Sequence, residues 1–71
     1  MSYTYQEQLD RFGLEIAGES IQKKKDPAYE PSLILEKVAK SLSHIYDVEY
    51  ERVLRDLSAK RNMQIVKLSD K

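Results

Sequence analysis

The chain has 71 residues, which gives room for one small domain and excludes a multi-domain enzyme with a separate cofactor module. Its 12 lysines and arginines balance its 12 aspartates and glutamates, so it lacks the net positive charge of most free-standing nucleic-acid-binding proteins. It has no cysteine, and therefore neither a disulfide nor a thiolate metal site can reinforce the core. We expect a single domain over residues 1–71 that forms a homodimer, because a core of this size is only marginally stable.

The first predicted helix lies near the N-terminus. Its apolar residues recur at steps of three or four, which places them on one side of an α-helix. They are Tyr5, Leu9, Phe12 and Ile16, and Ile21 extends the stripe after a slight drift. Gly13 and Gly18 each cost a helix about 1 kcal/mol relative to alanine, so a break near Gly18 is the alternative. The run Lys23-Lys24-Lys25 favours a helix end, and residues 25–31, which hold both prolines, predict a linker.

Two further helices are predicted over residues 32–46 and 48–61. Ser32 can cap the first of them and Asp47 can cap the second, because both side chains accept hydrogen bonds from free N–H groups. Apolar residues again recur at helical spacing in both segments. In the first segment they are Leu35, Val38, Leu42 and Ile45, with Ala39 and Tyr46 beside them; in the second they are Tyr50, Val53, Leu54 and Leu57.

After the third helix the sequence predicts a short strand over residues 63–68. Asn62 can take the left-handed conformation that ends a helix, and Ile65 and Val66 are β-branched residues that favour strands. A single strand needs a partner, which is either the N-terminal arm, residues 2–5, or the same strand of a second copy. The predicted fold class is therefore mainly α, with three helices and a C-terminal strand. The predicted core consists of Leu9, Phe12, Ile16, Leu35, Val38, Leu42, Ile45, Val53, Leu54 and Leu57.

The second and third predicted helices, joined by a short turn, have the skeleton of a helix-turn-helix, and this makes a dimeric DNA-binding regulator the alternative function. Recognition would depend on the basic residues of the third helix, which are Arg52, Arg55, Lys60 and Arg61. The first turn of that helix is acidic, however, and Glu49 and Glu51 would face phosphates. Pairs such as Glu51 and Arg55 fit a salt-bridged outer face equally well. One contiguous basic face would favour DNA, and alternation with acids would favour a protein partner.

A protein partner would contact apolar and aromatic residues that the core leaves unused. The candidates are Tyr3, Tyr5, Leu14, Tyr29, Leu33 and Ile34. The chain has five tyrosines and no tryptophan, and a tyrosine can bury its ring at an interface while its hydroxyl remains hydrated.

No catalytic, metal or cofactor site is predicted. His44 is the only histidine, and a lone histidine without cysteines does not make a metal site. The longest apolar run, residues 33–35, is far too short to cross a bilayer, so no membrane partner is expected and a cytoplasmic location follows by default. We therefore expect a small non-enzymatic protein-interaction module, an adaptor, inhibitor or accessory regulatory factor, that binds a larger protein.

Overall fold

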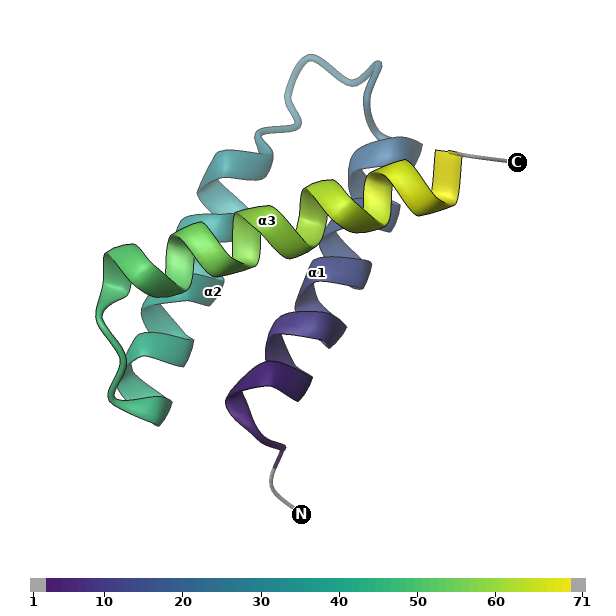
Figure 1. Ribbon diagram of the computed structural model, residues 1–71. Coiled ribbons are helices and arrows are strands. Elements are labelled where there is room, and N and C mark those ends of the chain that lie inside the picture. Colours follow the sequence, from purple (N-terminus) through teal and green to yellow (C-terminus); the bar gives the residue numbers. More distant parts are fainter. Residues whose placement is uncertain (1–2, 70–71) are drawn as a thin grey trace.

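The computed structural model describes residues 3–69, which form three helices: α1 (Tyr5–Gln22), α2 (Pro31–Tyr46) and α3 (Tyr50–Ser69). Helices α1 and α2 run in opposite directions beside each other, and α3 lies across both on one side (Figure 1). The molecule therefore has two layers, with α1 and α2 in one and α3 alone in the other. The predicted mainly α class and the three helices are confirmed.

Helix α1 begins with a capping box. The Thr4 hydroxyl accepts a hydrogen bond from the Glu7 N–H at 3.2 Å, and the Glu7 carboxylate accepts one from the Thr4 N–H at 2.8 Å. The hydrogen bond that the Thr4 N–H donates to the Glu7 carboxylate, and after it the nearby Thr4 hydroxyl, lower the pKa of Glu7 because they stabilise its charged form. The helix continues through Gly13 and Gly18 without the break that the sequence allowed, and it ends at Gln22.

The helix boundaries around α2 differ from two predictions. The helix begins at Pro31, one residue before Ser32, and its N-cap residue Glu30 makes no side-chain capping bond. Proline suits this first position because its fixed φ is helical and it has no N–H to satisfy. Asp47 does not cap the third helix; it ends α2 in the left-handed conformation, with a φ of 54°. Aspartate tolerates this conformation better than most residues, and α3 then begins at Tyr50.

The predicted strand over residues 63–68 is wrong, because α3 continues through this segment to Ser69, and Asn62 does not take a left-handed conformation. A helix satisfies the backbone of the segment internally, whereas a strand would need a partner. Relative to alanine, Ile65 and Val66 each lower helix stability by only about a few tenths of a kcal/mol. This penalty is small compared with the backbone hydrogen bonds that the helix forms. Of the proposed partner arm, Ser2 lies outside the described residues, and Tyr5 is already helical.

The core lies where α3 crosses the α1–α2 layer. Its buried apolar residues are Leu9, Ile16, Ala17, Leu35, Ala39, Leu42, Val53 and Leu57. Six of these belong to the predicted core, and the predicted Phe12, Val38 and Leu54 are partly buried against it. Ile45 is the error: 66% of its surface is exposed, because it lines an open groove beside α1 and is not packed into the core.

The contact between α1 and α3 is close because Gly13 has no side chain. A Cβ atom at Gly13 would lie 2.8 Å from the Cβ of Lys60 and 3.3 Å from the Lys60 carbonyl carbon, which is closer than such atoms pack. Polar contacts continue on the same interface: Lys60 Nζ lies 2.9 Å from Asp10 Oδ1, and Arg61 Nε donates to Ser20 Oγ at 3.1 Å. The two helices are therefore locked together by shape and by hydrogen bonds.

Within residues 3–69, no helix combines the length and the apolar composition needed to span a membrane.

Candidate protein-binding groove

The apolar residues proposed for protein binding do not gather at one site. Tyr5 donates a hydrogen bond to Asp56 Oδ2 at 3.0 Å and packs edge-on against Tyr46, and Tyr29 lies 2.9 Å from the Ser20 hydroxyl. These phenols hold the fold together. Burial, the hydrogen bond from Tyr5 to Asp56 and the negative charge of Asp56 raise the pKa of Tyr5 to about 12.

The remaining members of that set are spread over separate surfaces. Tyr3 precedes α1, where Arg11 lies over its ring at 4.3 Å and its backbone oxygen accepts a hydrogen bond from Tyr46 at 2.6 Å. Leu14 is exposed on α1 and Leu33 on α2, whereas Ile34 packs against the core. Of the six predicted residues, Tyr3, Leu14 and Leu33 are exposed, whereas Tyr5 and Ile34 pack against the core. The sequence did not indicate which of them share a surface.

The four basic residues of the DNA-binding alternative also differ in their surroundings. Lys60 and Arg61 turn towards α1, where Asp10 and Ser20 bind them. Arg52 lies 3.9 Å from Asp56, one turn further along α3, and Arg55 is exposed. A DNA surface that used all four would have to release two of them from the α1–α3 contact. The DNA-binding function stays a prediction, and no contact among the described residues favours it.

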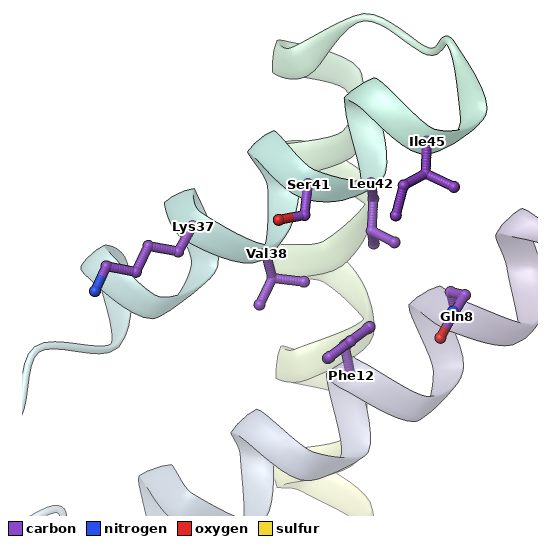
Figure 2. Close-up of a pocket in the computed structure, with 7 residues that line it drawn as sticks. All are labelled: Gln8, Phe12, Lys37, Val38, Ser41, Leu42 and Ile45. Atoms are coloured by element: carbon purple, nitrogen blue, oxygen red, sulfur yellow. The ribbon is translucent and has the colours of Figure 1, made fainter.

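A groove runs between α1 and α2 on the side that α3 leaves open. It has a volume of about 270 Å³ and is lined by Gln8, Phe12, Lys37, Val38, Ser41, Leu42 and Ile45. Phe12 and Val38 meet in the middle, Ile45 and Gln8 lie towards one end, and Lys37 lies at the other (Figure 2). The floor is therefore apolar and rigid, since Phe12, Val38 and Leu42 are part of the packed interior or touch it.

The groove exists because α2 has a wider apolar stripe than α3 can cover. Leu35, Ala39 and Leu42 are buried, whereas Val38 and Ile45 lie on the next side of the helix towards the groove. Residues 35, 38, 39, 42 and 45 form one apolar stripe, and only Leu35, Ala39 and Leu42 of it are buried. The exposed side of this stripe is an uncovered helix-packing surface.

The lining of the groove suits contact with an apolar surface. Its polar groups are one ammonium, one amide and one hydroxyl, on Lys37, Gln8 and Ser41. A wider polar hollow of about 560 Å³ lies at the turn between α2 and α3, beside His44 and Asp47. Within residues 3–69, no group of three histidines or acids is placed to hold a metal ion. The apolar groove is therefore the best-formed candidate site.

Comparison of the chain with known protein families, with curated proteins and with solved structures found no match.

The sequence analysis named the apolar residues of the groove but gave them another role, and it did not single out the polar Gln8, Lys37 and Ser41. It placed Phe12, Val38 and Ile45 in the core because each falls on a helical apolar stripe. The stripe of α2, which the sequence already shows, indicates which residues of this helix share a side, but not which of them a neighbouring helix covers.

Proposed function

We propose that this chain is a small non-enzymatic protein-interaction module, of the adaptor, inhibitor or accessory-factor class, that docks onto other protein chains through the α1–α2 groove. The observation that carries the proposal is the exposure of the Ile45 side chain beside the groove. This residue is 66% exposed at the edge of a groove whose floor is apolar, and it continues the stripe that packs the core. Covering a large aliphatic side chain of this kind contributes about 1.5–3 kcal/mol to an association.

A helix is the shape that fits this surface. The groove lies between two antiparallel helices, as does the seam into which a further helix packs in a helical bundle. An amphipathic helix would bring apolar residues over Phe12 and Val38 and leave its polar side facing solvent.

Site-specific photo-crosslinking tests the proposal. A photoreactive phenylalanine analogue replaces Ile45 in the full chain, and the same analogue replaces Leu33 as the matched control. Leu33 is a suitable control because it is 54% exposed on the same helix and does not line the groove. Irradiation in cells is expected to attach a protein chain at position 45 and little or none at position 33. Equal labelling at both positions, or no protein attached at either, contradicts the proposal.

A further inference from the structure

The groove has a polar asymmetry that limits what can occupy it. On α2, Lys37 lies at one end and the apolar Ile45 at the other, next to Gln8 of α1. On α1, Gln8, Phe12 and Glu15 follow one another at helical spacing along the same side, which places Glu15 one turn beyond Phe12, towards the Lys37 end. Lys37 and Glu15 are both exposed, and among the described residues neither has an ion-pair partner.

We propose that the groove binds the same groove of a second copy of this chain, so that α1 and α2 of both copies form a four-helix core with α3 outermost on each side. This inference rests on the proposed function and identifies the protein that the groove takes. A twofold axis parallel to the groove brings α2 of each copy against α1 of the other, in an antiparallel direction. Ile45 then lies over Phe12 and Gln8 of the second copy, and Lys37 lies beside Glu15 of the second copy.

Charge complementarity favours this occupant. The arrangement places two ammonium–carboxylate pairs, each Lys37 beside Glu15 of the other copy, together at one end of the interface, because a twofold axis parallel to the groove keeps these residues at the same height. Apolar side chains fill the rest of the contact, as they do in the buried part of most protein–protein interfaces. The net charge of the chain is zero, so two copies approach without long-range repulsion. An isologous contact of this kind also closes on itself and does not grow into a filament.

The small core favours the same occupant. The buried apolar set among residues 3–69 has eight members, and two of them are alanines. A chain of 71 residues without cysteine has few other means of stabilising its fold, and oligomerisation is the common one. A second copy is the one partner that is always present where the chain is made.

Sedimentation velocity of the purified full chain, from about 1 to 500 µM, tests the proposal. The wild-type chain is expected to move from monomer to dimer in this range. Ile45→Glu is expected to raise the dimer Kd about a hundredfold or more, because it buries a charge against the apolar end of the interface, over Phe12 of the second copy. Leu33→Glu, the control on the same helix, is expected to dimerise like the wild type. Circular dichroism checks that both variants keep the helix content of the wild type.

Charge-reversal variants of Lys37 and Glu15 test the dimer without depending on whether Ile45→Glu folds. Lys37→Glu alone and Glu15→Lys alone are each expected to weaken the dimer about fivefold, and the double variant is expected to return to the wild-type Kd. A wild-type chain that stays monomeric at the highest concentration overturns the dimer, as does a double variant weaker than both single ones. A monomeric chain that still crosslinks a different protein at position 45 overturns only the dimer and leaves the proposed function standing.

Discussion

Helix α1 meets its two neighbours in different ways. Against α3 it presents Gly13, and the backbones approach so closely that a single added carbon atom would clash with Lys60. Against α2 it presents Phe12 and Gln8, which leave a groove open to solvent between the helices. The first contact is closed, whereas the second leaves apolar side chains exposed to solvent. The difference indicates that the fold depends on the α1–α3 contact and that the α1–α2 surface is available for a partner.

The largest expected difference in stability comes from removing one side chain from the buried core and one from the α1–α2 groove. Leu57 lies on α3 and is completely buried, so Leu57→Ala is expected to lower the free energy of unfolding by about 3 kcal/mol through lost burial and a cavity. Ile45→Ala is expected to change it by roughly 0.5 kcal/mol or less, because most of that side chain is already in water. Urea unfolding of both variants, at a concentration that keeps the chain monomeric, measures the difference. Similar losses for both would contradict the division.

Alanine substitution of the two glycines of α1 is expected to change the stability of the fold in opposite directions. Gly13→Ala gains about 1 kcal/mol of helix propensity, but it forces α1 and α3 apart at a cost of about 2 kcal/mol, so a net loss is expected. Gly18→Ala meets no atom within 4 Å and is expected to stabilise the fold by about 0.5–1 kcal/mol. Thermal unfolding of the pair measures both signs. A stabilising Gly13→Ala would show that the crossing is looser than the structure describes.

The hydrogen bond from Tyr5 to Asp56 makes the α1–α3 contact sensitive to high pH. Tyr5→Phe is expected to cost about 1 kcal/mol at neutral pH, because it removes this bond. The pKa of Tyr5 is raised from 10.0 in the unfolded chain to about 12 in the fold, so its contribution is complete below pH 10 and is lost between pH 10 and about 12.

Urea unfolding at about pH 9 and about pH 11.5 therefore should show a steeper loss for the wild type than for Tyr5→Phe. Tyr50→Phe is the matched control, since the Tyr50 hydroxyl has no hydrogen-bond partner among the described residues. Its pH dependence is expected to follow that of the wild type. Parallel profiles for Tyr5→Phe and the wild type would remove Tyr5 as the source of the effect.

The smallest expected effect on stability is that of the Asp10–Lys60 ion pair at the edge of the α1–α3 contact. Asp10 and Lys60 are 2.9 Å apart, but their side chains are 57% and 30% exposed, so solvent screens their attraction. Asp10→Asn is expected to cost roughly 0.5 kcal/mol, and this cost is expected to shrink at high salt. Unfolding measurements at low and high ionic strength test it. A cost that is independent of salt would assign the effect to packing and not to charge.

The sequence predicted the inner side of each helix well and its partners poorly. Leu9, Ile16, Leu42 and Leu57 are buried as expected, because spacing along a helix decides which residues share a side. Spacing does not show which neighbour covers that side, and this is why Ile45 was placed in the core and is exposed. The predicted strand failed for a related reason. Residues 63–68 suit a strand locally, but no second strand exists among the described residues to pair with it.

The groove was predictable in part. The apolar stripe of α2 can be identified from the sequence, whereas the part of it that stays open can be assigned only when α3 is seen to lie on the other side. The close approach at Gly13 could not be predicted, because the sequence offers two glycines and does not distinguish the packed one from Gly18.

The two-layer arrangement also decides how the backbone is protected from solvent exchange. The molecule is only 21 Å across in its thinnest direction, which is about two helix diameters. No helix is surrounded, so every helix has one side whose amides open to water by small local fluctuations. The slowest hydrogen–deuterium exchange is therefore expected at amides on the facing sides of α1 and α3, near Gly13 and Leu57. The amides of α2 beside Ile45 should exchange sooner and slow down when a partner fills the groove.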